Sequence, residues 1–321
     1  MKVWELIFST TFLATVIRMT TPILFAGLAG LIASQAGVMN LAVESIMLTS
    51  ALAGVLISAW TGSAWIGLLG AVLIGIGMGF VIAYTAFTLH ADMVLNGVAF
   101  NLMMTGGTVF LLYVATGQKG TSTGVPSKVL PTVNIPLLKD IPYVGEVLSG
   151  HNVLTYIAVA FTILMFYFLF KTKIGLRIRM VGENPAAAES VGINSKKIKY
   201  LAMCLSGMFA ALGGAYMSMA YMSWFQNNIT AGRGFIGMAA SALGGNMPLG
   251  TLMASLLFGV ADAVANTISS LNLPSELVSM LPYVITIIGL VYYSIYLSKR
   301  KAPASKAKEE PKPSEEGKET I

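Results

Sequence analysis

Residues 65–89 read WIGLLGAVLIGIGMGFVIAYTAFTL, a run of apolar and small residues without one charged side chain. A helix needs about 20 such residues to cross the hydrocarbon of a bilayer, so this stretch predicts a membrane-spanning helix. The composition of the whole chain agrees: 55% of its 321 residues are hydrophobic, 11% are charged and the mean hydropathy is +0.75. Soluble domains carry about 25% charged residues. The sequence therefore predicts an all-α integral membrane protein.

Comparable hydrophobic windows continue along almost the whole chain. We expect about ten transmembrane segments, near residues 4–17, 20–33, 43–60, 65–89, 93–116, 152–170, 198–222, 232–245, 248–268 and 279–297. Three of these windows are too short to cross a bilayer alone. Such segments are expected to be tilted, broken or re-entrant, with their free backbone groups buried in protein.

The polar stretches predict the orientation in the membrane. Residues 171–199 carry many more Lys and Arg than acidic residues, and the tail 299–321 begins Lys-Arg-Lys. Because such an excess is typical of the cytoplasmic side, both are expected to be cytoplasmic and the loop 117–151 to be extracytoplasmic. Ten crossings place both termini in the cytoplasm. The transmembrane domain is then residues 1–298, followed by a charged tail predicted to be disordered. The formal net charge of +6 is explained by these loops and not by nucleic-acid binding.

Two short stretches of the chain echo each other. Residues 36–42 read AGVMNLA and residues 231–237 read AGRGFIG, and each follows a hydrophobic segment. Two halves of five crossings have opposite orientations, which predicts an inverted repeat with a substrate path at its interface. Chance similarity between two stretches of small residues is the alternative.

The loop stretch GLRIRMVGENPAAAESVGI, residues 175–193, encodes a short helix with both ends marked. Asn184 is a good N-cap, Pro185 suits the first helical position, and Gly192 suits the C-terminal turn. The helix is shorter than the about 12–15 residues needed for stability in isolation, so it must pack on something. A hydrophobic groove of a soluble partner fits its small side chains, and the chain's own membrane domain is the alternative.

These residues carry a resemblance to a known family. The run 175–193 resembles the cytoplasmic coupling segment of ABC importer permeases of the branched-chain amino acid, ribose and nucleoside type. Residues 36–50 and 232–250 resemble the two repeated signatures of that family. The stretches DMVLNGVAFNL (92–102) and GQKG (117–120) are similar to elements of its nucleoside and simple-sugar branch. The likeness extends over most of residues 20–297, and its most specific part is the coupling segment.

The resemblance implies a complete transporter in the prokaryotic plasma (inner) membrane. Two permease subunits, usually non-identical, would form the pathway, ABC ATPase subunits would bind the coupling helices, and an extracytoplasmic solute-binding protein would deliver the solute. This chain itself would bind no cofactor or metal, and ATP would be hydrolysed on the partner chain. The sequence contains no G-x-x-x-x-G-K-[ST] phosphate loop, which agrees with that division. The ATPase coupling residues would be Glu183, Asn184, Pro185, Ala186, Ala187, Ala188, Glu189 and Gly192.

Ionisable residues within membrane segments indicate function by default. The candidates are Arg18, Glu44, Asp92, Arg233, Asp262 and Glu276. Residues at segment ends are equally explained by snorkelling to the interface. Glu44 and Arg233 each follow an echoed glycine motif. Structural charge pairing is favoured over substrate contact for both, and a pair with each other is one such arrangement, although the sequence gives no distance between them. Asp262 lies one helical turn from Asn266, and its simplest interpretation is a polar contact between helices.

A nucleoside or sugar must be released quickly, so we expect mainly uncharged hydrogen-bonding groups and aromatic rings along its path. The predicted path residues are Asn40, Glu44, Asn96, Phe100, Asn101 and Phe235. Asn96 and Phe100 share a helix face at i and i+4. Capping of chain breaks and helix packing is the alternative role for all of them.

Catalysis finds no support in the sequence. Cys204 is the single cysteine, the two histidines are far apart, and H-E-x-x-H does not occur. We therefore predict a nucleoside or simple-sugar permease subunit without catalytic residues. A permease for branched-chain amino acids or another small solute remains open. So does an ion-coupled secondary transporter, which would require an acid cluster deep in a helix but no coupling helix.

Overall fold

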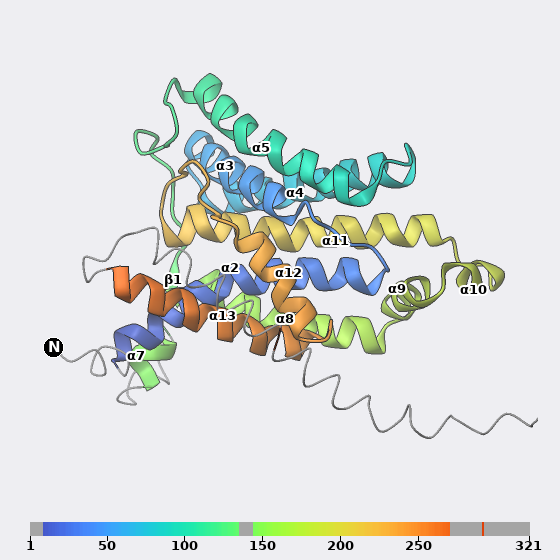
Figure 1. The fold of residues 1–321 in the computed structure, drawn as a ribbon. Coiled ribbons are helices and arrows are strands. Elements are labelled where there is room, and N and C mark those ends of the chain that lie inside the picture. Colours follow the sequence, from blue (N-terminus) through green and yellow to red (C-terminus); the bar gives the residue numbers. More distant parts are fainter. Residues whose placement is uncertain (1–8, 135–143, 270–290, 292–321) are drawn as a thin grey trace, which may run out of the picture.

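The computed structural model describes residues 9–134, 144–269 and 291, and the structural statements below concern these residues. Seven of the described helices are long and apolar enough to cross a membrane. They are α2 (Thr10–Gln35), α3 (Val43–Thr61), α4 (Ala64–Phe87), α5 (Met93–Thr116), α8 (Val153–Lys171), α11 (Ser195–Tyr216) with its π-helical continuation η1 (Met217–Tyr221), and α13 (Pro248–Ser269). They form one elongated bundle (Figure 1).

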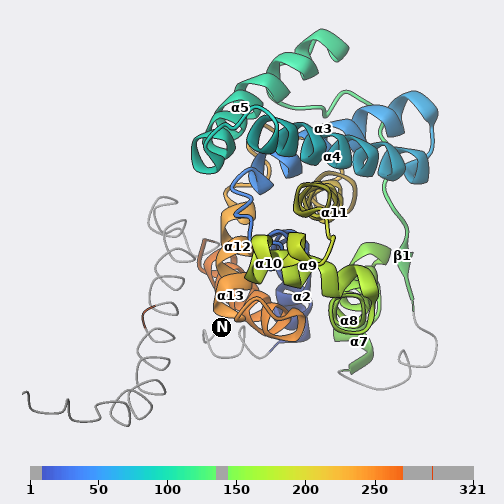
Figure 2. The same cartoon turned by 90° about the vertical axis from the view of Figure 1, so that its right-hand side faces the viewer.

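Helix α2 lies at the centre of this bundle. Its side chains from residue 19 to residue 33 are all buried, and it packs against α8, α11, α13 and the shorter helix α12 (Arg233–Leu243). Figure 2, which looks along the bundle, shows α2, α8, α12 and α13 on one side of α11 and α3, α4 and α5 on the other. Helix α5 is at the margin and leaves most of its apolar side chains exposed, as expected of a helix that faces lipid or another subunit.

The first two predicted segments, 4–17 and 20–33, are not separate. From Thr10 they form the single helix α2, so the predicted break between them is wrong. Arg18, which lies between the two windows, and Pro22 both fit within the helix. Arg18 lies on an exposed face. Beside Pro22, the Thr21 hydroxyl donates to the Ile17 carbonyl, and hydroxyls of this kind allow proline within a membrane helix.

The other predicted segments agree better with the structure. Windows 43–60, 65–89, 93–116, 152–170, 198–222 and 248–268 each coincide with a helix to within a few residues, and 232–245 contains α12. Window 279–297, Glu276 and the tail 299–321 lie outside the described residues. The total of ten segments and their inverted repeat therefore stay predictions.

The two ends of the bundle differ in structure. At one end, β1 (Thr132–Val133) pairs antiparallel with β2 (His151–Asn152), next to the short helix α7 (Val144–Leu148). Asn152 connects this end to α8, because its side chain accepts from Leu154 N and donates to the Leu130 carbonyl. The opposite end carries α9 (Lys173–Glu183) and α10 (Pro185–Ser190), which project beyond the spanning helices (Figure 1).

Two helices begin away from the ends of the bundle. After α2 ends, residues 36–42 run back along the bundle without helical structure before α3 begins (Figure 1). Helix α12 runs obliquely across the bundle after another non-helical stretch. The first turns of α3 and α12 are in direct contact through Glu44. We call this meeting point the junction, defined by residues 40–45 and 230–234 with their partners.

Candidate functional site

The exposed end of the bundle carries the helix predicted from residues 184–192, and the prediction of that helix is confirmed. The Asn184 side chain accepts a hydrogen bond from Ala187 N (3.1 Å), and Pro185 occupies the first helical position. Gly192 has a φ of +82° and donates its N–H to the Glu189 carbonyl (2.9 Å). These contacts satisfy helix-end groups that would otherwise lack partners. We call α9 and α10 together the platform.

The platform is open to solvent on one side. Every residue of α10 is exposed except Ala188, which is 1% exposed. An open groove of about 270 Å³ lies between α9 and α10 and is lined by Leu176, Met180 and Ala187, among others. Val191, just beyond α10, is 65% exposed. Exposed apolar residues gathered on a projecting part of a molecule are typical of a site for another protein. Figure 2 looks at α9 and α10 from outside.

The platform contacts the spanning helices backbone to backbone. A Cβ at Gly182 would collide with the Gln35 carbonyl at the end of α2. Gly37, with a φ of +70°, faces Gly182 so closely that a Cβ there would lie 3.1 Å from the Gly182 oxygen. Only glycine permits such an approach. Displacement of α9 must therefore also displace residues 35–37.

The non-helical stretch that follows is held by asparagine side chains. Asn40 accepts from Ala42 N (3.1 Å) and donates to the Ser206 hydroxyl (2.9 Å) on α11. Asn101 on α5 donates to the Leu41 carbonyl (2.9 Å) and accepts from the backbone N–H of residue 45 (2.9 Å). Backbone groups away from water require partners of this kind. Both amides therefore have a structural role in this chain.

Glu44 binds the N-terminal end of α12. Its carboxylate is 6% exposed and accepts from the Thr230 hydroxyl, from Gly232 N (2.9 Å) and from Gly234 N (2.7 Å). Glu44 also lies in the first turn of α3. One negative charge therefore faces the positive ends of two helix dipoles. A side chain at Gly234 would displace the carboxylate, because its Cβ would lie 2.6 Å from Glu44 Oε2.

Arg233 makes a structural ion pair, as favoured from the sequence, but its partner is not Glu44. Arg233 Nη2 instead lies 3.2 Å from Asp262 Oδ2 on α13, and the exposed fractions of the two side chains are 16% and 8%. The carboxylate of Glu44 is occupied by backbone N–H groups on either side of Arg233. Asp262 was expected to make a polar contact between helices, and its partner is this charged group.

The remaining path residues do not gather in one place. Asn96 is 8% exposed and connects α5 to α4, accepting from the Thr85 hydroxyl (3.0 Å) and donating to the Ile82 carbonyl (3.1 Å). Phe100 is half-buried against the core. Phe235, in the first turn of α12, is 45% exposed. Asn40, Glu44 and Asn101 thus converge on the start of α3, whereas Asn96 does not.

Sequence reasoning missed Thr230, Ser206 and the contact between Gly182 and Gly37. Thr230 and Ser206 act through partners 186 and 166 residues away in the sequence, and no local pattern reveals such distant pairs. Gly182 did leave a signal. A glycine inside a short helix destabilises that helix, so its presence in α9 suggests a need for close approach.

In the described residues, seven helices that are long and apolar enough to span a bilayer indicate a multi-pass membrane protein. The chain belongs to the branched-chain amino acid transport system / permease component family, which matches residues 12–290. Membership in this family of translocation subunits is consistent with a non-enzymatic role.

Similar proteins come from several bacteria. The chain is 33% identical to the nucleoside ABC transporter permease NupC of Lactococcus lactis, covering 90% of this chain and 93% of NupC. It is 34% identical to the guanosine ABC transporter permease NupQ of Bacillus subtilis (84% and 87% covered), and 27% identical to NupP, a guanosine permease of the same bacterium (91% and 84% covered). The resemblance to ABC importer permeases is therefore confirmed.

A solved structure has a similar fold. A chain of PsaBC from Streptococcus pneumoniae, determined in complex with Fab, matches 86% of this chain with a TM-score of 0.52 and 17% identity, and 89% of that chain is covered. At this identity the similarity concerns the fold alone.

Proposed function

We propose that this chain is one permease subunit of an ATP-driven nucleoside importer, and that a separate ATPase subunit binds α10. The observation that carries the proposal is the platform. It is an exposed two-turn helix, too short to be stable alone, joined to the bundle by the backbone contact between Gly182 and residues 35–37. The coupling residues proposed are residues 183–189 and Gly192.

The same contact provides a route for movement. Residue 37 is separated from Glu44 by only seven positions, and Asn40 and Asn101 hold that stretch to α11 and α5. Glu44 in turn holds α12. A shift of α9 driven by the ATPase would reach the junction through backbone and hydrogen bonds. The physical support for this route is contiguity, and α3 and α12 are the elements that would move.

The orientation follows from the same assignment. The α9–α10 end would face the cytoplasm, in agreement with its many Lys and Arg residues, and the β1–β2 end would face outside. Ser9, where the described chain begins, then lies at the external end of α2. The expected cytoplasmic location of the N-terminus concerns residues 1–8, which lie outside the described residues.

Names of relatives support the substrate class and the second subunit. NupP and NupQ are both guanosine ABC transporter permeases of Bacillus subtilis, which supports a transporter built from two different permeases. A solute-binding protein outside would deliver the nucleoside. Phe235 is the best placed of the six path residues for substrate contact, because it is exposed on this chain and lies at the junction. The others have structural partners within the chain.

Replacement of Ala187 by Glu tests the coupling proposal. Ala187 is exposed and lines the groove of the platform. Ala188 is buried, so a charged residue in its place would disturb the fold. In Ala187→Glu we expect the membrane level to remain normal while the co-purified ATPase and nucleoside uptake both fall at least tenfold, since an unpaired charge is desolvated in the interface. Ala91→Glu is the matched control, because Ala91 is exposed in the loop between α4 and α5.

Uptake that survives both Ala187→Glu and removal of ATP would favour an ion-coupled transporter. Substrate class is tested separately in vesicles that contain the whole transporter. We expect labelled guanosine and adenosine to accumulate, with unlabelled nucleosides competing and glucose and leucine not competing. Competition by leucine alone would assign the chain to the amino acid branch.

A further inference from the structure

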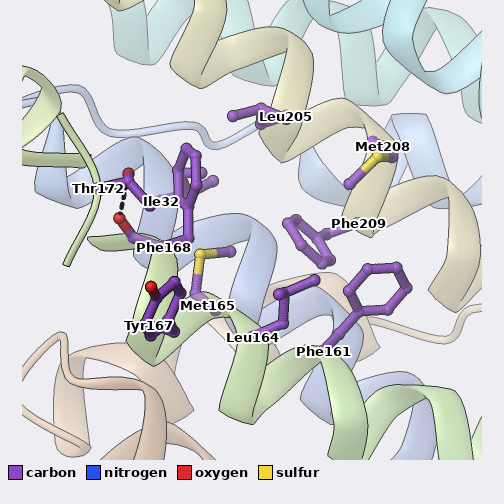
Figure 3. Close-up of a pocket in the computed structure, with 10 residues that line it drawn as sticks. All are labelled: Ile32, Phe161, Leu164, Met165, Tyr167, Phe168, Thr172, Leu205, Met208 and Phe209. Carbon is purple, nitrogen blue, oxygen red and sulfur yellow. Dashed lines mark hydrogen bonds between the residues drawn. The ribbon is translucent and has the colours of Figure 1, made fainter. Parts of the chain in front are cut away.

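A second groove lies within the spanning part of the bundle, between α8 and α11, with α2 as its floor. Its volume is about 340 Å³ and its accessible lining is entirely apolar (Figure 3). Residues that line it include Ile32, Phe161, Leu164, Phe168, Leu205 and Met208. Two lining residues carry a hydroxyl, Tyr167 and Thr172, and that of Thr172 donates to the Phe168 carbonyl. Neither the platform nor the junction uses this groove.

In a membrane, two kinds of apolar group pack against such a groove, a helix and a lipid tail. The charged residues at the end of the groove distinguish them, because an anionic phospholipid carries a negative headgroup next to its tail and a spanning helix does not.

Charges at the end of the groove indicate the headgroup. Lys171 follows Leu164 and Phe168 on α8, at i+7 and i+3, and therefore continues the line of the groove. On α11, Lys197 lies 11 residues before Met208 on the face that also carries Leu201. Both lysines are exposed, and within the described chain neither forms an ion pair. Each wall of the groove thus ends in an available positive charge.

We propose that this groove binds one anionic phospholipid, with an acyl chain between α8 and α11 and the phosphate between Lys171 and Lys197. Both lysines lie at the α9–α10 end, where long basic side chains extend to the membrane surface. Juxtamembrane lysines attract anionic lipids of the cytoplasmic leaflet. The bound lipid would stabilise the connection between α8 and α11 from which the platform projects. The proposal rests on the membrane location of α8 and α11, and transport is not required for its test.

The test compares lipid retention by the full chain in native mass spectrometry. Phosphatidylglycerol and phosphatidylcholine with the same acyl chains are supplied in turn. We expect one retained phosphatidylglycerol, and Lys171→Gln with Lys197→Gln should reduce its preference over phosphatidylcholine at least tenfold, because each lysine near the surface contributes several-fold. Met208→Trp should reduce retention of both lipids, since the indole fills the groove.

The matched control is Lys173→Gln with Lys196→Gln. Both lysines are exposed, but Lys173 begins α9 and Lys196 lies on the opposite side of α11 from Leu205. If this control lost the preference for phosphatidylglycerol to the same extent, the preference would come from the general surface charge, and the proposal would be overturned. So would unchanged retention in Met208→Trp.

The occupant itself is tested with the single cysteine of the chain. Cys204 lies beside the groove, between Leu201 and Met208 on one face of α11, and is partly exposed. We expect N-ethylmaleimide to label it more slowly when phosphatidylglycerol is bound. A disulfide between Cys204 and a cysteine introduced at Ile287 or Ile288 would show that the chain's own C-terminal segment covers the groove, and would overturn the assignment to lipid.

Discussion

The junction and the platform satisfy their polar groups in opposite ways. At the junction, the Glu44 carboxylate is buried and binds groups that lie 186 to 190 residues away in the sequence. At the platform, the Asn184 side chain caps α10 by accepting from the backbone N–H of Ala187, three residues further along the chain. The Ser190 hydroxyl donates to the Ala187 carbonyl. The junction therefore exists only in the completed fold. The platform forms from local sequence and leaves its outer surface free for a partner.

This difference suggests a division of labour. Buried polar networks destabilise strongly when they are broken and thus specify one arrangement. Locally capped helices open at a low free energy. In the proposed transporter, the ATPase would move the platform and the junction would change its arrangement in response. A locally capped helix suits the first role, and a buried network with discrete arrangements suits the second. The following substitutions test this contrast.

Asp262→Asn should have the largest effect on stability. It removes the ion pair and leaves the Arg233 charge without its partner at 16% exposure. Breaking a buried pair costs about 3–5 kcal/mol, so the variant should unfold at a clearly lower temperature. The unfolding temperature is measured in detergent by tryptophan fluorescence. Combined Arg233→Met and Asp262→Leu should recover most of the loss. A double variant as unstable as the single one would contradict this account.

Glu44→Gln should have an intermediate effect. The amide retains one acceptor oxygen where the carboxylate uses two, and the charge facing two helix ends disappears. We expect a loss of about 1–3 kcal/mol in the free energy of unfolding, measured in the same way. Glu189→Gln on exposed α10 is the control and should change stability little. Equal effects at both positions would remove the distinction between the two regions.

Asn184→Ala should have the smallest effect, and a local one. It removes the hydrogen bond to Ala187 N at a cost of about 1 kcal/mol, which Asn184→Ser should largely restore. Amide hydrogen exchange should become faster in residues 185–190 while the unfolding temperature is unchanged. Faster exchange around Glu44 as well would show that the two regions are more tightly coupled than their contacts indicate.

The sequence predicted what local patterns determine. Apolar windows gave most of the spanning helices, and the order Asn184, Pro185, Gly192 gave α10 with its caps. The break around Arg18 was wrong because the sequence does not tell which face of a helix is exposed. Arg18 extends outward, so the helix continues past it.

The candidate site was less predictable, because its contacts join residues that are far apart in the sequence. The echo between residues 36–42 and 231–237 drew attention to the beginnings of two helices that meet through Glu44, but not to the atoms that bind. Backbone N–H groups at the start of α12 bind the Glu44 carboxylate, and backbone donors carry no sequence signature. The sequence therefore did not identify the partner of Arg233. Asn40 and Asn101 were recognised as important polar residues, yet their hydrogen bonds to the chain become visible only in three dimensions.

The long separation between Glu44 and Gly234 has a consequence for biosynthesis. At about 5–20 residues per second, roughly 10–40 s pass after Glu44 is added to the chain before its partners at residues 230–234 are made. During that time α3 enters the membrane with an unsatisfied acid at its start. A nascent chain that stops before residue 230 lacks all three of these partners for the carboxylate.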